Sequence, residues 1–319
     1  MHPVTDLRGT AMVTRDGSVV AELAAGPADV EAGVACTPDT RFQLCSVSKQ
    51  FAAAAALLLV ESGRLDLHEP VDRWLPAGPP QWQQVTLHHL LSHTAGVPHW
   101  LEAPGLDPAE PMSVSRRLEI IRATPLRSAP GTQWHYSSLG FVLAGSIVER
   151  ASGQPYPRFL AEKILSPLKL TQTAVGGIPG GAARGYNDGQ PVPPWDLDAM
   201  PGTGDIWSTA GDLTRFVTAL HAGELIAASS LRAMCTAHAS IDDDDDGEPK
   251  LTTTGYGYGM FAGNFAGHAA WYHPGDNPGY RTMACWLPDR AASIVVLVND
   301  ETVSVPGLLR QLLPAAVEP

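Results

Sequence analysis

The sequence predicts a mixed α/β (α+β) protein whose antiparallel sheet is built from both chain termini and flanked by helices. Three observations predict this class: strand-like stretches lie near both ends, helical patterns fill the middle, and no internal repeat interrupts this order. Strands from both ends with helices between them favour a sheet covered by helices. We expect an α/β unit from residues 1–66 and 205–319 and an inserted helical unit from residues 67–204.

Hydrophobic periodicity, caps and turn residues locate the elements in chain order. The N-terminal part is expected to contain strands at 7–13 and 18–23, an extended stretch at 40–44 and a helix at 46–60. The middle is expected to contain helices at 86–91, 113–123, 137–150 and 157–165, a loop at 176–201 and a helix at 209–220. The C-terminal part is expected to contain strands at 256–261, 269–273, 280–287 and 293–298 and a helix at 305–313.

Composition and charge narrow the classes of partner. Of the 319 residues, 44% are hydrophobic and 17% are charged, which is typical of a globular protein with a core. The formal net charge is -12 at pH 7. Because phosphate groups are bound by clustered Lys and Arg, this charge disfavours nucleic acid and an anionic membrane surface. We expect a small-molecule or peptide acyl substrate as the partner, and the sequence leaves the oligomeric state open.

The first residues and the spacing of the cysteines favour a cytoplasmic location. The N-terminus shows no basic segment followed by an apolar one, which disfavours a secretory leader. The sequence contains no run of about twenty apolar residues, so it predicts no membrane span. The cysteines, Cys36, Cys45, Cys235 and Cys285, lack paired metal-ligand spacing. We therefore expect a cytoplasmic protein with reduced thiols, no metal and no cofactor.

Ser46 and Lys49 form the first chemical pattern, at the start of the alanine- and leucine-rich helix expected at 46–60. Residues three apart share one helix face, so the two side chains are expected to meet. An amine beside a serine hydroxyl can accept its proton, which activates the serine as a nucleophile. The alternative is an ordinary helix start, with Ser46 as the N-cap and Lys49 in solvent.

Tyr136 belongs to a second pattern, after the turn at Pro130-Gly131 and just before the helix expected at 137–150. A lysine ammonium nearby is expected to lower the pKa of the phenol, which suits a general base or proton shuttle. The alternative is a tyrosine packed at a helix start.

His273 and Gly275 belong to a third pattern, in a segment that runs from the end of a strand into a turn. A glycine-rich turn after a histidine lets a substrate backbone approach the strand edge closely. The alternative is a hairpin turn with an ordinary surface histidine.

Together these patterns resemble the serine beta-lactamase and penicillin-binding-protein superfamily, in its class C beta-lactamase, DD-peptidase and esterase branch. That family carries Ser-x-x-Lys, then Tyr-x-Asn or a variant, then Lys-Thr-Gly or His-x-Gly. Here the order is Ser46-Val47-Ser48-Lys49, Tyr136-Ser137-Ser138 and His273-Pro274-Gly275. The resemblance covers roughly residues 8–312. It implies a beta-lactamase/transpeptidase-like fold, with the active site in the cleft between the two units.

The resemblance also implies a role for each matched residue. Ser46 is expected to be acylated, Lys49 to accept its proton, and Tyr136 to relay protons to the leaving group and the incoming water. The backbone N–H groups of Ser46 and Asp276 are expected to form the oxyanion hole, where one donor contributes about 3 kcal/mol. His273 is expected to orient Tyr136 or a substrate carboxylate.

Two departures from the family pattern point away from beta-lactam hydrolysis. Ser138 stands where Asn is common, and its shorter side chain reaches less far toward a substrate amide. His273 replaces a lysine and carries little charge at pH 7 with an unperturbed pKa of about 6.5. The sequence thus favours a serine hydrolase of esters or amides with weak or no beta-lactamase activity. The alternatives are an acyltransferase or peptide-cyclising enzyme on the same fold, and a non-catalytic acyl-binding sensor.

Three other features are interpreted as structural. The histidines His88, His89 and His93 include an i, i+4 pair but lack a carboxylate or third ligand at a fitting spacing for zinc. The acidic run 242–246 lacks the spacing and glycine of a calcium loop. The tryptophans at positions 195, 207 and 271 are expected to line a substrate cleft or to lie in the core.

Overall fold

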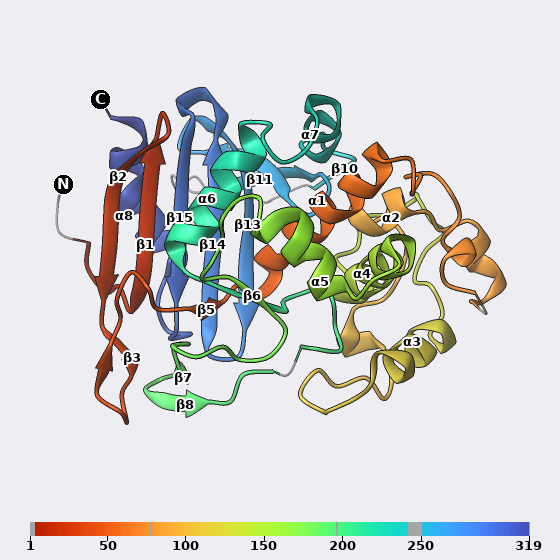
Figure 1. Cartoon of the computed structure of the whole chain (residues 1–319), viewed down its shortest axis with the longest axis horizontal. Helices are drawn as coiled ribbons and strands as arrows, with labels where there is room; N and C mark the ends of the chain where they lie inside the picture. The colour runs from red at the N-terminus through yellow and green to blue at the C-terminus, as the bar shows by residue number, and fades with distance from the viewer. Residues whose placement is uncertain (1–3, 77, 196, 242–250, 319) are drawn as a thin grey trace.

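The computed structural model describes residues 4–76, 78–195, 197–241 and 251–318. An eight-stranded antiparallel sheet forms one side of the molecule, and both chain ends lie at its β2 end (Figure 1). In spatial order its strands are β10 (Ala239–Ser240), β11 (Leu251–Tyr256), β12 (Phe261–Phe265), β13 (His268–Asn277), β14 (Tyr280–Leu287), β15 (Ala292–Val298), β1 (Gly9–Arg15) and β2 (Ser18–Ala25). The first and last parts of the chain therefore share one sheet, which confirms the predicted fold class.

Most helices gather beyond the opposite end of the sheet (Figure 1): α1 (Ser48–Glu61), α2 (Leu87–Leu91), α3 (Val114–Ala123), α4 (Ser138–Ser152), α5 (Tyr156–Leu160) and α7 (Ala228–Met234). Two helices pack on the sheet itself, α6 (Ala210–His221) on one face and α8 (Val305–Val317) on the other. Small two- and three-stranded sheets connect the parts: β3 (Pro27–Asp29) with β4 (Val34–Ala35), β5 (Phe42–Gln43) with β9 (Ile206–Ser208) and β6 (Ala174–Val175), and β7 (Gly185–Asn187) with β8 (Gln190–Val192).

Alternation along β15 divides the core between the two faces of the sheet. Val295 and Leu297 point into the larger core, together with α1, α4 and α6. Ile294 and Val296 point to the other face, where they join a core that includes Leu312 of α8. Successive strand side chains face opposite sides, so a wholly apolar strand predicts burial on both faces. This explains why β15 contains only buried residues.

The helix α1 is buried along most of its length and directly follows the turn that carries Ser46. Its alanines 52–56 have no exposed surface, and small side chains allow close packing against α4. Phe51 stacks on Phe216 of α6 with ring centroids 3.6 Å apart, which ties α1 to the helix over the sheet. A helix that is apolar on all sides is stabilised by packing, not by its own propensity. The N-terminal end of α1 is therefore held rigidly.

Two strand predictions at the C-terminal part were wrong in detail. Residues 256–261 form no single strand, because β11 ends at Tyr256 and β12 begins at Phe261. Gly257 and Gly259 lie between them, and Gly259 has a φ of 70°, a turn conformation that glycine adopts without strain. The third pattern, expected to enter a turn, instead continues β13 as far as Asn277.

Two further expectations concern a membrane span and the acidic run. In the described part of the chain, no helix is long and apolar enough to cross a membrane. The acidic run 242–246 lies outside the described residues. We retain the boundaries at residues 66/67 and 204/205 as a proposal.

Candidate active site

Ser46 lies in a short 3₁₀ turn, Cys45–Val47, directly before α1, and we call this segment the nucleophile turn. Cys45 has a φ of 52° and no exposed surface, so the backbone reverses sharply just before Ser46. The N-cap of α1 is Val47, without a side-chain cap. The alternative of Ser46 as an N-cap is therefore wrong, and its hydroxyl is available for other contacts.

Lys49 is buried with no exposed surface, and its amine reaches back to the nucleophile turn. Lys49 Nζ donates to Ser46 Oγ at 3.0 Å and to the Thr203 carbonyl at 3.1 Å. Ser138 Oγ lies 3.4 Å from the same nitrogen. These contacts exclude the alternative of a solvated lysine. They also place the amine within proton-transfer distance of the serine hydroxyl.

Burial lowers the pKa of Lys49 from its usual value to about 7, against the opposing attraction of Cys45 and Asp205. Desolvation disfavours the charged form of an amine, which explains the direction. A large fraction of Lys49 is thus neutral near pH 7, as a proton acceptor must be.

Tyr136 lies beside this pair, with Lys49 Nζ 5.0 Å from its ring centroid. Burial raises the pKa of Tyr136, and an interaction with the Ser46 side chain offsets only part of that rise. The expectation of a lowered pKa was wrong, because desolvation of the phenolate outweighs the nearby amine. Tyr136 is therefore a neutral phenol at pH 7, suited to donating a proton.

His273 is buried and faces Tyr256 more directly than Tyr136. Its Nε2 lies 3.0 Å from the Tyr256 hydroxyl, and its Nδ1 lies 2.6 Å from the Pro274 carbonyl. A carbonyl only accepts, so Nδ1 carries the proton and Nε2 accepts from Tyr256. Burial lowers the pKa of His273 to about 3, with a further contribution from Lys49. The ring lies 6.1 Å from that of Tyr136, a packing contact without a hydrogen bond.

Gly275 allows β13 to pack directly against the nucleophile turn. A Cβ at this position would lie 2.6 Å from the Leu44 carbonyl oxygen, 2.8 Å from Cys45 Cβ and 2.1 Å from Thr282 Oγ1. Only glycine fits such a close approach. The segment that approaches Gly275 is thus the turn carrying Ser46, and a direct role of Gly275 toward a substrate stays a prediction.

The end of β13 forms a strand edge beside Ser46. In the described residues, pairing with β12 stops at Tyr272, whereas pairing with β14 continues to Asn277. Pro274 has no N–H and is tolerated where no ladder bond is needed. Because N–H directions alternate along a strand, the N–H of Asp276 points to the same open side as position 274. The Asp276 side chain forms an ion pair with Arg281 at 2.6 Å.

These segments enclose a pocket of about 290 Å³ that opens beside Ser46. Ser138 Oγ lies in its wall, 3.5 Å from His99 Nε2. Burial lowers the pKa of His99 to about 4, so this ring is neutral as well. The residues that line the pocket are Ser46, His99, Trp100, Tyr136, Ser138, Phe261, His273, Pro274 and Asp276. The structure thus brings together the predicted residues of all three patterns, with Gly275 behind the lining.

Sequence reasoning missed several residues that hold the site. The backbone N–H of Ser137 donates to His93 Nδ1 at 3.1 Å, and the His93 ring lies 4.4 Å from that of Tyr136. Thr203 contributes its backbone carbonyl to the site. Every residue has this group, so the sequence cannot indicate it. Asp205 accepts from the Gly202 N–H at 3.0 Å and so fixes the loop that carries this carbonyl. Of these residues, only His93 stood out in the sequence, as a member of a histidine pair at i, i+4 spacing.

Among the described residues, no group of three His, Cys, Asp or Glu side chains could hold a metal ion. The two histidines of the i, i+4 pair have separate partners: His89 Nδ1 accepts from the Thr86 N–H at 3.2 Å, whereas His93 Nδ1 accepts from the Ser137 N–H at 3.1 Å. Trp271 packs against the large core. Trp195 and Trp207 line a second cavity instead of the Ser46 pocket.

Comparison with known proteins gives the same fold. Esterase EstB from Burkholderia gladioli is 37% identical over an alignment of 201 residues, which covers 57% of this chain and 51% of the esterase. The chain thus matches about half the length of that relative. A penicillin-binding protein from Bacillus halodurans superposes with a TM-score of 0.83, at 25% identity over 96% of this chain and 95% of that protein.

A D-amino acid amidase from Ochrobactrum anthropi superposes with a TM-score of 0.82, at 25% identity over 96% of this chain and 92% of the amidase. The family model described as Beta-lactamase matches residues 5–316. The chain therefore belongs to the beta-lactamase family and is a serine hydrolase of the beta-lactamase-like superfamily.

Proposed function

We propose that the protein hydrolyses an ester or amide through an acyl-enzyme formed on Ser46, with weak or no activity toward beta-lactams. The observation that carries this proposal is the 3.0 Å contact between the buried Lys49 Nζ and Ser46 Oγ. Neutral Lys49 takes the proton from Ser46 as Oγ forms a bond to the substrate carbonyl carbon. The carbonyl oxygen becomes an oxyanion, bound by the backbone N–H groups of Ser46 and Asp276.

The intermediate collapses when the bond to the leaving group breaks. Tyr136, a neutral phenol, donates a proton to the leaving group and is reprotonated from Lys49. Water then attacks the acyl carbon, and the same groups return its proton to Ser46 Oγ. Because burial raises the pKa of Tyr136 and disfavours its phenolate, Tyr136 takes the proton of Lys49 as it gives up its own, so that no phenolate accumulates.

The charge of the pocket supports a substrate without a carboxylate at the His273 position. Among the described residues that line the Ser46 pocket, none is Lys or Arg. His273 is neutral because burial lowers its pKa to about 3. The neighbouring Arg281 is already paired with Asp276 and Glu301, at 2.6 Å and 2.9 Å. A penicillin carboxylate would therefore lose its hydration without gaining a cation.

The esterase and the amidase among the related proteins support these two substrate classes. The test is turnover of p-nitrophenyl acyl esters, of D- and L-phenylalanine amide and of nitrocefin. We expect ester or amide turnover that exceeds nitrocefin turnover and disappears in Ser46→Ala. The variant Ser62→Ala, at the far end of the same helix, should retain full activity. Preferred turnover of nitrocefin would contradict the proposal.

An added amine acceptor separates hydrolysis from acyl transfer. Hydrolysis predicts that the free acid remains the main product when hydroxylamine is added at concentrations far below that of water. Predominant formation of the acyl hydroxamate would favour the acyltransferase instead.

A further inference from the structure

The Ser46 pocket is lined mainly by aromatic and imidazole rings, which are His99, Trp100, Tyr136, Phe261 and His273. Trp100 and Phe261 are only half-buried, so part of each side chain is still exposed. Aromatic surface of this kind gains free energy when an apolar group covers it. The lining thus offers ring surface to whatever part of a substrate lies beside Ser46.

The polar side chains of the pocket already have partners within the protein. Ser46 Oγ and Ser138 Oγ lie 3.0 Å and 3.4 Å from Lys49 Nζ. His273 uses both of its ring nitrogens in hydrogen bonds within the protein. A polar substituent of a substrate would therefore lose its hydration and find few free partners, whereas an apolar substituent has no hydrogen bonds to lose.

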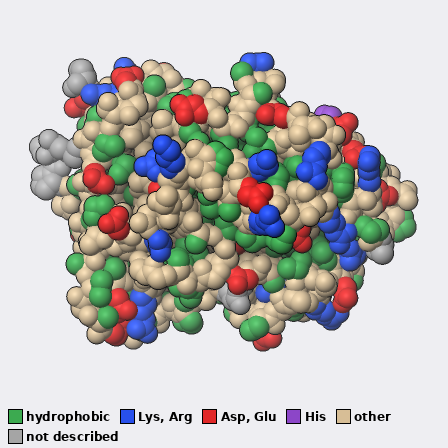
Figure 2. Space-filling model, viewed as in Figure 1, with side chains coloured by type: hydrophobic (Ala, Val, Ile, Leu, Met, Phe, Trp, Pro, Cys, Tyr) green, Lys and Arg blue, Asp and Glu red, His purple; other side chains and the backbone are tan. Residues whose placement is uncertain are grey.

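Charge disfavours ionised substituents as well. Among the described residues that line the pocket, none is Lys or Arg, and the one carboxylate belongs to Asp276. The Asp276 side chain is 71% exposed and is already paired with Arg281. Figure 2 shows acidic and basic side chains interspersed on one face of the molecule, with hydrophobic ones between them. The pocket therefore favours an uncharged, apolar group.

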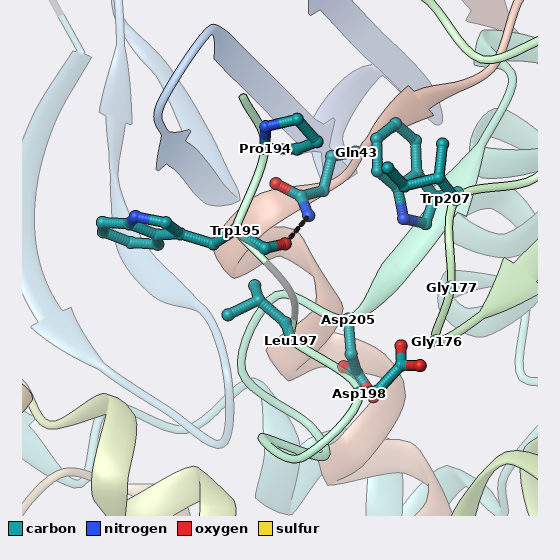
Figure 3. Close-up of a pocket in the computed structure, with 10 residues that line it drawn as sticks. Gln43, Gly176, Gly177, Pro194, Trp195, Leu197, Asp198, Asp205 and Trp207 are labelled. Atoms are coloured by element: carbon teal, nitrogen blue, oxygen red, sulfur yellow. Dashed lines mark hydrogen bonds between the residues drawn. The ribbon is translucent and has the colours of Figure 1, made fainter. Parts of the chain in front are cut away.

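The Trp100 ring is supported from behind by Trp195, which packs edge-on against it with ring centroids 5.0 Å apart. In the second cavity, which Figure 3 shows, the Trp195 indole points away from Asp205, and the Trp195 carbonyl accepts from Gln43 Nε2 at 3.5 Å. Gln43 Oε1 accepts from Asn277 Nδ2 at 2.8 Å, at the end of β13. The support of Trp100 is thus tied to the strand that borders the pocket.

Glu102 holds the short turn that carries Trp100. Its carboxylate accepts from the His99 backbone N–H at 3.0 Å, lies 3.1 Å from His135 Nε2 and forms an ion pair with Arg127. The turn is therefore fixed at its far end by residues of the loop before α4. A surface that is already ordered binds a ligand without a large ordering cost.

Phe261, at the start of β12, is held by the rings around it. Its ring centroid lies 4.8 Å from that of Tyr256 and 5.5 Å from that of Tyr272. Its plane is within 5° of the plane of Tyr136. Aromatic rings pack on one another edge-to-face or offset, with centroids about 4.5–7 Å apart. Rigid rings such as Trp100 and Phe261 therefore select a further ring over a flexible chain.

We propose that the Ser46 pocket binds an uncharged aromatic ring of the substrate, next to the scissile carbonyl and against Trp100 and Phe261. This inference rests on the proposed hydrolysis at Ser46 and adds a substrate class and two specificity-determining side chains. The pocket of about 290 Å³ is large enough, since a cavity of about 150 Å³ holds benzene. The ring belongs either to the acyl part or to the leaving group, and substrates distinguish the two.

Two isomeric esters place one ring on either side of the same bond. Methyl phenylacetate carries it on the acyl part and benzyl acetate on the alcohol part. Methyl cyclohexylacetate and cyclohexylmethyl acetate are the saturated controls, and each kcat/KM is divided by the alkaline hydrolysis rate of the same ester. We expect one aromatic isomer to exceed its control about twofold to tenfold, because ring pairs contribute beyond the area they bury. No aromatic preference in either pair would overturn the proposal.

Variants assign the preference to the two side chains. Trp100→Ala should lower kcat/KM for the preferred aromatic ester about tenfold and leave that for methyl propanoate, which has no ring, unchanged. Trp100→Phe, which keeps a ring, should retain most of the preference. Leu101→Ala is the matched control, because Leu101 lies in the same turn, is 86% exposed and does not line the pocket. Equal losses for both esters in Trp100→Ala would indicate a structural role and refute the specificity role.

Phe261→Leu replaces the second ring by an apolar side chain. It should bring the ratio between the aromatic ester and its saturated control close to one while turnover of methyl propanoate persists. An unchanged ratio in this variant would remove Phe261 from the ring site.

Calorimetric titration of Ser46→Ala makes the ring test independent of turnover. The preferred aromatic ester should bind this variant more tightly than its saturated control does, and the difference should disappear when Trp100→Ala is added. Ring-selective binding without turnover by the wild type would refute the proposed hydrolysis and leave the ring site standing. Turnover without ring selectivity would refute the ring site alone.

Discussion

Two of the segments that line the Ser46 pocket invite comparison: the nucleophile turn, which continues into α1, and the open edge of β13. Each buries one basic side chain, Lys49 in the first and His273 in the second. Lys49 directs its amine at Ser46 Oγ, whereas His273 accepts from Tyr256 and donates to the Pro274 carbonyl. Burial lowers the pKa of both, to about 7 for the lysine and about 3 for the histidine.

The difference shows that burial alone does not make a catalytic base. The same desolvation brings an amine into the physiological range and moves an imidazole out of it, because their ordinary pKa values differ. On this basis we expect Lys49 to titrate during the proposed reaction and His273 to stay neutral.

The largest expected effect comes from the lysine. Lys49→Ala should reduce the rate of fluorophosphonate labelling at pH 7 by at least about a hundredfold, the lower range for loss of a general base. Lys163→Ala, an exposed lysine, should label at the wild-type rate. Near-native labelling of Lys49→Ala, with an unchanged circular dichroism spectrum, would refute its role as the proton acceptor.

The next effect concerns how β13 supports the nucleophile turn. Gly275→Ala forces a Cβ to within 2.1 Å of Thr282 Oγ1, and overpacking of this kind destabilises by about 1–3 kcal/mol. Denaturant unfolding should show this loss, together with slower labelling of Ser46. Gly180→Ala is the control, since its added Cβ meets nothing within 4 Å. Wild-type stability of Gly275→Ala would show that the turn and strand are not tightly packed.

The pH dependence of acylation should reflect the protonation state of Lys49. The rate requires neutral Lys49, so it should fall as pH decreases through about 7. The negative charge of Asp205 raises the pKa of Lys49, so Asp205→Asn should move this acidic limb to lower pH. Labelling rates between pH 5 and 9 measure the shift. A limb that moves to higher pH would contradict the electrostatic coupling.

The smallest effect is expected at the histidine. His273 remains neutral in the physiological range, so His273→Gln should leave the acidic limb at the same pH while the rate changes modestly. The same labelling series measures it. Disappearance of the limb in this variant would show that the histidine, and not the lysine, titrates.

The sequence predicted the residue types of the site better than their surroundings. Ser46 and Lys49 were predictable because a fixed helical spacing brings them together. The raised pKa of Tyr136 was not, because it results from burial by segments distant in the chain. The strand expected at 256–261 failed for a local reason, since its glycines favour the turn between β11 and β12. The role of the Thr203 carbonyl could not be predicted from the sequence, because a residue of any type can supply a backbone carbonyl.

The most direct test is peptide mapping by mass spectrometry after treatment with a fluorophosphonate. We predict one modified peptide, which carries the label on Ser46, and no label in Ser46→Ala. An unlabelled Ser46 in folded wild-type protein, or a label on another residue, would contradict the acyl-enzyme.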